Sequence, residues 1–287
     1  MGNKNNKSSQ ELICENLEKL KLLFPKPGNG IVNVSHRLSL KLYAEEFIDL
    51  DINSKIIELE STIPYYRKVR GDGNCFYRSI YFLLMELGLK KKSDNLFIFD
   101  LLYDKVDFDL SNFNFADQKL AKKMKENNNL YEILKVLQEK LFDDPDIILE
   151  KLFSEDFLFD FTSIIFVRSL IFTKLKKSLN DPVFAPFITF PDTIKRKLLT
   201  YGIEAEDIII PLTCSTLSIG LVIHILHVSH EGEKKVTLLK EEYYPFEIQS
   251  EEEKKKLPIF NLFFRPGHYD IAYPNLDEDF KCMMDDE

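Results

Sequence analysis

The sequence predicts an α+β fold in which a small central β-sheet packs against a large helical lobe. Three stretches of the chain predict it. From Phe76 the apolar residues recur at offsets of four, seven, eight and eleven, which is the spacing of one buried helix face. Residues 157–172 form the most apolar run, which we expect to be the central helix of the lobe. Residues 259–274 hold two β-prone runs around Pro266 and Gly267, which predicts a hairpin.

The composition excludes several classes of protein. At 287 residues, with 45% hydrophobic residues and 24 phenylalanines, the chain has enough apolar material for a large core in one or two domains. Its net charge of −9 argues against a general nucleic-acid binder, because such proteins need a basic face. Four scattered cysteines without CxxC pairs predict neither a disulfide framework nor a zinc site, and they favour a reducing compartment. These are Cys14, Cys75, Cys214 and Cys282.

The two ends of the chain differ from its middle. The first ten residues, MGNKNNKSSQ, are polar, so we expect residues 1–10 to be disordered and to carry no secretory signal. Gly2 partly fits an N-myristoylation signal, although position six holds Asn where the signal has Ser or Thr. Residues 276–287 form an acidic tail, which leaves residues 11–275 as a single predicted domain.

Two helical stretches are expected before the first motif. Residues 11–24 have the spacing of an amphipathic helix that ends before Pro25, and this helix either packs on its own domain or lies in a partner's groove. Residues 40–60 form the second stretch, which leads to a basic cluster at residues 67–70. That cluster either contacts an acidic partner or forms a solvated edge, which is the commoner role of charges beside a loop.

The stretch RGDGNCFYRSIYFLLMEL, residues 70–87, places a cysteine at the start of a buried helix. Gly71 and Gly73 allow a tight or positive-φ backbone, and Asn74 is a natural N-cap. Cys75 then lies in the first turn, where unpaired backbone N–H groups and the positive end of the helix dipole favour a thiolate. The sequence therefore predicts a nucleophilic cysteine, with a half-buried structural cysteine as the alternative.

The middle of the chain is predicted to be mostly helical. Residues 95–178 contain several helices, and the apolar run 157–172 is not a membrane span because Asp160 and Arg168 fall inside it. A short basic helix is expected over residues 194–201.

A buried strand is expected over residues 219–228, after an acidic turn and the apolar run 208–211. Residues 251–256 are expected to form a solvated charged loop. Three histidines spaced by threes would share a face only on a helix, so on this strand they do not predict a metal site. They are His224, His227 and His230.

The hairpin contains the sequence IFNLFFRPGHYDIAYP. Residues two apart on a strand face the same way, so His268 and Asp270 should project side by side, with Tyr269 on the opposite face. The carboxylate can accept a hydrogen bond from one imidazole nitrogen and leave the other nitrogen to face a neighbour. If that neighbour is Cys75, the three residues form a base-activated thiol nucleophile. Considered alone, each residue has a structural alternative: His268 as a histidine at a strand end and Asp270 as a solvated carboxylate.

The segments GDGNCFYRSI and RPGHYDIAY resemble the two signature segments of the otubain family of ovarian-tumour-type (OTU) deubiquitinating cysteine proteases. The similarity covers residues 45–274, closely at both ends and diffusely in the middle. It implies a papain-like OTU cysteine protease fold. It also implies that Cys75 is the nucleophile, His268 the general base and Asp270 the acid that orients it, with Asp72 as a further residue of the catalytic loop.

The resemblance implies a ubiquitinyl hydrolase, which cleaves the isopeptide bond after the C-terminal glycine of ubiquitin in a thiol-dependent reaction. The implied partners are ubiquitin and polyubiquitin conjugates, with ubiquitin-conjugating enzymes as a further class. No metal, cofactor, nucleic acid or transmembrane segment is implied, and we expect a monomer in the cytoplasm, with the nucleus as a second compartment. Two alternatives stay open: a non-catalytic module that binds ubiquitin or a conjugating enzyme, and a cysteine peptidase with other substrates.

Substrate contacts are expected from two loops. Backbone N–H groups of the first loop should stabilise the oxyanion, and Asp72 should hold this loop and present its own amide. An acidic turn should receive the arginine-containing tail of ubiquitin, since the resemblance places this turn near the catalytic end; a helix N-terminus is its alternative role. The candidate residues are Gly71, Gly73 and Asn74 in the first loop and Glu204, Glu206 and Asp207 in the second.

Overall fold

The computed structural model describes most of the chain between Val32 and Pro274. The described residues are 32–46, 48–90, 110–116, 130–143, 148–182, 184–205, 208–229 and 235–274, with Leu102, Val106 and Lys122 as isolated positions. The predictions for residues 1–10, for the helix at 11–24 and for the tail at 276–287 lie outside these residues. No helix in the described ranges is both long and apolar enough to cross a membrane.

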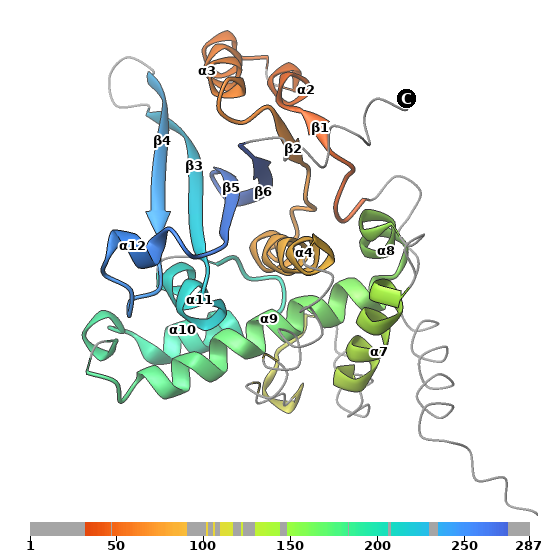
Figure 1. Ribbon diagram of the computed structural model, residues 1–287, viewed down its shortest axis with the longest axis vertical. Coiled ribbons are helices and arrows are strands. Elements are labelled where there is room, and N and C mark those ends of the chain that lie inside the picture. Colours follow the sequence, from red (N-terminus) through yellow and green to blue (C-terminus); the bar gives the residue numbers. More distant parts are fainter. Residues whose placement is uncertain are drawn as a thin grey trace, which may run out of the picture.

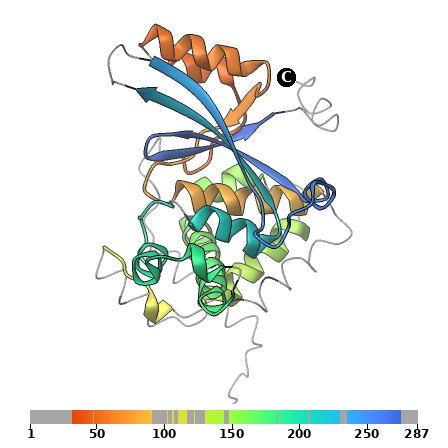
Figure 2. The same cartoon turned by 90° about the vertical axis from the view of Figure 1, so that its left-hand side faces the viewer.

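Within the described residues, six strands form one sheet in the order β1-β2-β6-β5-β3-β4. Neighbouring strands are antiparallel except β3 and β5, which are parallel. The sheet lies between two layers of helices (Figures 1 and 2). The strands are β1 Leu38–Ser39, β2 Tyr65–Arg67, β3 Gly220–Ser229, β4 Lys235–Tyr243, β5 Ile259–Arg265 and β6 His268–Tyr273.

The helices divide between the two faces of the sheet. Helices α2 and α3 cover one face, and α4 packs against β5 and β6 on the other, where the helical lobe lies (Figure 1). Two short 3-10 helices occupy Leu110–Asn112 and Ala185–Phe187. The α-helices are α2 Leu40–Glu45, α3 Leu50–Glu60, α4 Cys75–Lys90, α7 Leu130–Asp143, α8 Leu149–Glu155, α9 Phe157–Ser178, α10 Pro191–Leu198, α11 Ile209–Leu217 and α12 Glu251–Lys254.

Helix α9 is the central helix of the lobe, as predicted from its apolar run. The Asp156 carboxylate accepts a hydrogen bond from the Phe159 N–H at 3.1 Å, which caps the helix N-terminus. Eighteen of its 22 residues are buried, because α4, α7, α8, α10 and α11 all pack around it. Even Asp160 and Arg168, the charged residues of the run, are buried inside the protein.

Strand β6 is buried along its whole length, and its residues alternate between the two cores. Tyr269, Ile271 and Tyr273 face the helical lobe. Ala272 faces the smaller core under α2 and α3, which places His268 and Asp270 on that same face. The strand alternation therefore decides which side of the sheet each candidate site residue reaches.

The structure corrects several sequence-based predictions. Residues 40–60 form two helices, because α2 ends at Glu45 and α3 begins only at Leu50. The Asp49 carboxylate caps α3 by accepting hydrogen bonds from the Asp51 and Ile52 N–H groups at 3.1 and 3.3 Å. The predicted loop at 251–256 begins with the single helical turn α12, which Ser250 caps. Strand β4 was not predicted, because its sequence KVTLLKEEY mixes charged with apolar residues and lies at the sheet edge.

Other sequence-based predictions need a smaller correction or none. The basic helix starts at Pro191 rather than residue 194, since proline is well suited to the first helical position. The run 208–211 begins helix α11. On β3, His224 is buried and His227 is exposed, as the strand alternation predicted.

We predict that replacing Phe166 by Ala lowers the free energy of unfolding by about 3–5 kcal/mol, the usual effect of truncating a buried aromatic residue. Phe166 is 0% exposed on α9, and its ring meets Tyr81 edge-on at 6.1 Å. Phe190, which is 71% exposed, is the matched control, and Phe190→Ala should change the free energy by less than about 1 kcal/mol. Urea denaturation of both variants measures this; equal losses would contradict the assignment of α9 as the core helix.

Candidate active site

The two predicted motifs meet where the N-terminus of α4 lies against the start of β6. Cys75 is the first residue of α4, and His268 is the first residue of β6. The backbone N–H of Tyr269 donates a hydrogen bond to the Cys75 Sγ at 3.4 Å, across 194 positions of sequence. Cys75 is 1% exposed and His268 is 8% exposed, so the pair is almost closed to solvent.

Asp270 orients the imidazole of His268. The distance between His268 Nε2 and Asp270 Oδ1 is 2.9 Å, and the Val69 N–H donates to the same oxygen at 2.8 Å. Asp270 is completely buried, so these two bonds hold its carboxylate in one position. The other ring nitrogen, Nδ1, lies beside Gly71, where an added Cβ would be 3.1 Å away. The loop can therefore approach the ring this closely because residue 71 has no side chain.

The surroundings of His268 favour its protonated form. Burial alone would lower the pKa of His268, but hydrogen bonds to Asp270 and Cys75 and the negative charges of both outweigh it and raise the pKa from 6.5 to about 9. At neutral pH the ring is thus an imidazolium next to the sulfur of Cys75. A cation at this position stabilises a thiolate, the form of cysteine that acts as a nucleophile.

The carboxylate of Asp72 holds the loop before α4. It accepts a hydrogen bond from the Asn74 N–H at 3.0 Å and two from the Arg78 guanidinium at 3.0 and 2.8 Å. Burial would raise the pKa of Asp72, but the bonds and charge of Arg78 outweigh it and lower this pKa. The expected role of Asp72 in holding the loop agrees with these contacts.

The sequence-based expectation is that the Asp72 amide faces the oxyanion, but in the structure the amide of Asp72 has another acceptor. Its N–H donates to the Arg70 carbonyl at 3.2 Å, and the N–H of Asn74 is used by the Asp72 carboxylate. Within the part of the chain that the structure describes, the N–H groups of Gly73 and Cys75 have no acceptor. These two groups are therefore the candidate oxyanion donors of the loop.

The side chain of Asn74 does not have the predicted role of capping α4. Its backbone carbonyl accepts from the Arg78 N–H at 2.9 Å, so α4 begins where the sequence predicted. Its side-chain oxygen instead accepts from the Arg168 guanidinium and from the Gly202 N–H, both at 2.9 Å. Asn74 thus joins the loop before α4 to the loop at residues 202–205.

Gly73 is required where these two loops touch. Its φ is +74°, and a Cβ added to it would lie 1.9 Å from the Gly202 carbonyl oxygen, far inside van der Waals contact. Gly202 itself has a φ of +86°. No side chain can be accommodated at residue 73 unless one of the loops moves.

Two buried arginines support this arrangement, and sequence analysis gave neither a role in the site. Arg78 bonds Asp160 at 2.6 and 3.0 Å, and Arg168 bonds the carbonyls of Gly73 and Ile203 at 3.3 and 2.6 Å. Arg168 also lies over the Tyr77 ring, 3.7 Å from its centroid. The signal that could have found them was present in the sequence, since charged residues inside apolar helices need buried partners.

The acidic turn is placed only in part. The Glu204 carboxylate oxygens lie 3.5 and 3.9 Å from the position of a Cβ on Gly267, which belongs to the hairpin turn next to His268. The neighbouring Ala205 carbonyl accepts a hydrogen bond from the Tyr269 hydroxyl at 3.5 Å. Glu206 and Asp207, the other two predicted residues of this turn, lie outside the described residues.

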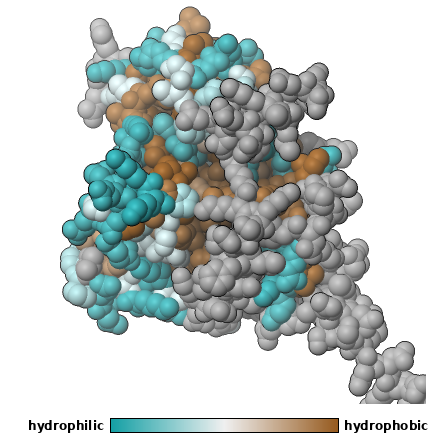
Figure 3. All heavy atoms as spheres, viewed as in Figure 1, coloured by the Kyte–Doolittle hydropathy of each residue, from teal (hydrophilic) through white to brown (hydrophobic). Residues whose placement is uncertain are grey.

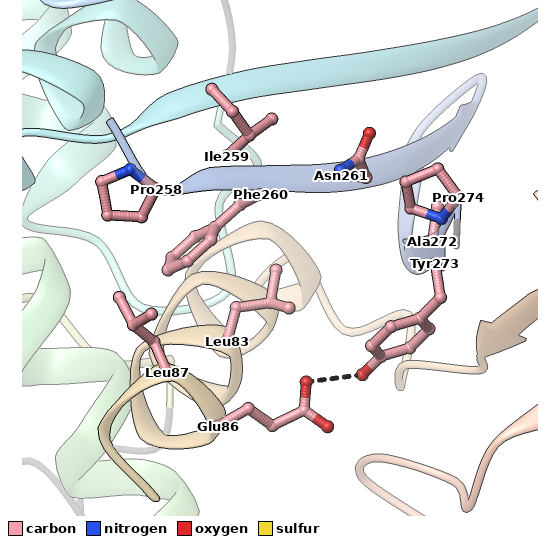
Figure 4. A pocket seen from close by; sticks show the side chains of 10 residues that line it. All are labelled: Leu83, Glu86, Leu87, Pro258, Ile259, Phe260, Asn261, Ala272, Tyr273 and Pro274. Carbon is pink, nitrogen blue, oxygen red and sulfur yellow. Dashed lines mark hydrogen bonds between the residues drawn. The ribbon is translucent and has the colours of Figure 1, made fainter. Parts of the chain in front are cut away.

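A cavity of about 280 Å³ lies at the opposite end of the β5–β6 hairpin from His268 (Figure 4). Leu83, Leu87 and Phe260 line it, together with Glu86 and Tyr273, whose side chains hydrogen-bond to each other at 2.8 Å (Figure 4). No cysteine or histidine is among the described residues that line it. The candidate nucleophile Cys75 and the candidate base His268 are therefore not part of this cavity.

Comparisons with known proteins give the family of this chain. The family model for Peptidase C65 Otubain matches residues 32–274. The chain belongs to the otubain family. Among curated relatives, the Arabidopsis thaliana "OVARIAN TUMOR DOMAIN-containing deubiquitinating enzyme 1" is 26% identical over 236 residues, which are 77% of this chain and 73% of the relative. The Homo sapiens "Ubiquitin thioesterase OTUB1" is 26% identical over 246 residues, which are 84% of this chain and 82% of the relative.

Solved structures with the same fold extend the comparison. A complex of ceOTUB1 with ubiquitin aldehyde and UBC13~Ub aligns with a TM-score of 0.62 at 18% identity, covering 94% of this chain and 100% of that one. A complex of h/ceOTUB1 with ubiquitin aldehyde and UBCH5B~Ub has the same TM-score at 20% identity, with 93% and 98% covered. The predicted α+β otubain fold is thus confirmed.

In this otubain-family chain, we predict that Asp270→Asn lowers the pKa of His268 from about 9 toward its ordinary value of 6.5, because the ring loses its carboxylate. Histidine NMR titration measures the shift, with His268→Gln assigning the signal. Asp51→Asn, which removes an exposed carboxylate on α3, should leave the titration of His268 unchanged.

The His268–Asp270 pair also makes the free energy of unfolding depend on pH. Because folding raises the pKa of His268, its stabilising contribution is complete below pH 6.5 and disappears as the pH rises through about 9. The stability difference between the parent and Asp270→Asn should therefore shrink over that range. A His268 signal that titrates near 6.5 in the parent protein would contradict the assigned contact.

Proposed function

We propose that the chain hydrolyses the isopeptide bond after the C-terminal glycine of ubiquitin, with Cys75 as nucleophile, His268 as base and Asp270 as the residue that orients the base. The observation that carries this proposal is the meeting of the Cys75 sulfur with the β6 segment that holds a hydrogen-bonded His268–Asp270 pair. Membership of the otubain family supports ubiquitin as the substrate, because relatives are named ubiquitin thioesterase and deubiquitinating enzyme.

The chemistry follows from the positions of these groups. The thiolate of Cys75, stabilised by the imidazolium of His268, attacks the carbonyl carbon of the terminal glycine. The oxyanion that forms lies near the N–H groups of Gly73 and Cys75, which have no acceptor among the described residues. Losing one such donor typically lowers the rate about 10²–10³-fold. His268 then gives its proton to the leaving lysine amine, and water, deprotonated by the same ring, hydrolyses the thioester. Every step uses side chains and amides of the chain itself.

Glu204 is the residue we propose for the tail of ubiquitin. Its carboxylate lies beside the hairpin turn that precedes His268, within reach of a segment that enters the site over Gly267. The tail of ubiquitin contains arginines, which a carboxylate attracts. Glu206 and Asp207 belong to the same acidic stretch and share this proposed role.

Ubiquitin-conjugating enzymes are a second class of proposed partner. Both neighbouring structures contain a conjugating enzyme charged with ubiquitin, named UBC13~Ub in one and UBCH5B~Ub in the other. That observation favours binding of a charged conjugating enzyme as an additional, non-catalytic function of this chain. Binding alone has no physical need for the Cys, His and Asp set, so the hydrolase stays the main proposal.

We also propose the cellular compartment in which the protein acts. Cys75 and Cys214, the cysteines within the described residues, are both free thiols. Free cysteines persist in a reducing compartment, which supports the cytoplasm, with the nucleus as a second location. We propose that the enzyme acts there as a monomer.

We predict that ubiquitin with an electrophile at its C-terminus labels the protein covalently, and that Cys75→Ala abolishes this labelling. Cys214→Ala is the matched control and should be labelled like the parent, because burial raises the pKa of the Cys214 thiol to about 12 and keeps it unreactive. Intact-protein mass spectrometry measures both results. If Cys75→Ala is labelled, or if the parent protein is not labelled, Cys75 is not the nucleophile.

We also predict that Glu204→Lys raises KM for a ubiquitin C-terminal amide about fivefold, because an attractive contact with the tail becomes repulsive. A ubiquitin whose tail arginines are changed to glutamate should recover part of the loss with this variant. Glu252→Lys, on the exposed helix α12, is the matched charge control. Steady-state kinetics with both ubiquitins measures the effect, and unchanged KM values for Glu204→Lys would exclude its binding role.

A further inference from the structure

A cavity of about 400 Å³ opens directly beside the base of the candidate active site. His268 and Gly71 form its inner wall, and three basic residues, Lys68, Arg70 and Arg265, line the rest together with small or apolar groups. No acidic residue is among the described residues that line it. In a chain with a net charge of −9, this is a local concentration of positive charge.

Arg265 lines the cavity next to His268. It is the cross-strand partner of His268 in the β5–β6 hairpin, so the two side chains lie on the same face of the sheet. Its Nε is buried and makes no hydrogen bond within the described residues. Asp270 lies two residues beyond His268 on β6 and therefore on the same face of the sheet. The guanidinium lies 5.9 Å from the Tyr43 ring centroid.

The other two cations are partly balanced by neighbouring carboxylates. Lys68 bonds Glu46 at 2.8 and 3.0 Å, on the exposed rim of the cavity. The Nε of Arg70 lies 3.7 Å from the Asp72 carboxylate, which is already bound by Arg78. Lys68 and Arg70 each have a carboxylate within 4 Å, so Arg265 is the cation of this cavity that has no such ion pair in the described residues.

The cavity lies on the other side of the hairpin from the proposed binding site of the ubiquitin tail. Tyr269 faces the loop that contains Glu204 and Ala205, whereas His268, one residue earlier, faces the cavity. An arginine-containing tail would be attracted by Glu204 and repelled by the cations around Arg265. The tail is thus expected along one face of the turn, and the cavity is left for the other half of the substrate.

The chemistry of the leaving group points to the same assignment. The base that protonates the departing lysine amine must come within hydrogen-bond reach of that nitrogen. Because the ring of His268 forms a wall of the cavity, the lysine and its neighbouring residues leave the site on the cavity side. The residues on either side of the modified lysine then lie against Arg265 and Lys68.

We propose that this cavity binds the acceptor segment of the conjugate and selects isopeptide-linked lysines that have acidic neighbours in their own sequence. This inference rests on the proposed hydrolase function. It assigns Arg265 as a specificity-determining residue that contacts the carboxylates beside the acceptor lysine. The substrate class is therefore ubiquitin attached to lysines in acidic segments.

The test uses two conjugates in which ubiquitin is joined through its C-terminal glycine to the lysine of a short peptide. The peptides are identical except that glutamates flank the lysine in one and glutamines flank it in the other. We expect the full-length protein to cleave the glutamate conjugate with a kcat/KM about fivefold higher, the scale of a partly exposed charge pair. Near 1 M salt, where the screening length is about 3 Å, this preference should disappear.

Variants of the cavity connect the preference to Arg265. Arg265→Gln should reduce the ratio of the two kcat/KM values to below about twofold, and Arg265→Glu should invert it, because the positive charge is removed or reversed. Arg265→Lys keeps the charge and should keep a preference for the glutamate conjugate. Lys68→Gln should reduce it by a smaller factor, because Glu46 already balances part of that charge. Lys240→Gln, an exposed lysine of β4, is the matched control and should leave the ratio unchanged.

The outcomes separate this inference from the function on which it rests. Equal cleavage of both conjugates, or a preference that Arg265→Gln and Arg265→Glu leave intact, would overturn the acidic-acceptor assignment while the hydrolase function stands. If the electrophilic ubiquitin does not label Cys75 and neither conjugate is cleaved, the proposed function itself fails. A fivefold preference that follows the charge of residue 265 would support both.

Discussion

The candidate site depends on one buried guanidinium, that of Arg168. Its terminal NH2 group donates to the carbonyls of Gly73 and Ile203 and to the Asn74 side chain, at 3.3, 2.6 and 2.9 Å. A charge buried this deeply is stable only while such partners stay in place, and removing them would leave an uncompensated cation in the core. These bonds therefore hold the loop before α4 and the loop at 202–205 together.

A second guanidinium, that of Arg78, does the same on the other side of the loop. It bonds Asp160 of α9, the Asp72 carboxylate and the Arg70 carbonyl, so the loop is tied to the centre of the helical lobe. This accounts for the charged residues inside α9, the central helix of the lobe. Helix α9 contributes Asp160 and Arg168 as well as core side chains, and mutations that tilt this helix would disturb the position of Cys75 without touching it.

The parts of the site that follow local periodicity could be predicted, and those that depend on distant partners could not. The helical spacing after Cys75 and the alternation of His268 and Asp270 are properties of single elements, so the sequence alone predicts both. Asn74, by contrast, turns its side chain toward partners 94 and 128 positions away. Likewise, the Asp72 amide bonds the Arg70 carbonyl because of how the whole loop folds. No spacing rule contains that information, although two charges inside an apolar helix indicate that buried partners exist.

Strand alternation also separates the two halves of the substrate in the function proposed here. His268 and Tyr269 are adjacent in sequence but face opposite sides of β6, so the loop with Glu204 lies on one side and the cavity with Arg265 on the other. A slip of one residue in the pairing of β5 with β6 would turn His268 and Asp270 to the opposite face of the sheet, away from the Val69 N–H that holds the Asp270 carboxylate. The register of this hairpin therefore specifies at once where the base points, where a cationic tail is tolerated and where an acidic segment is attracted. A protein with a net charge of −9 can present a positive cavity beside its base because a single strand separates that cavity from the acidic turn.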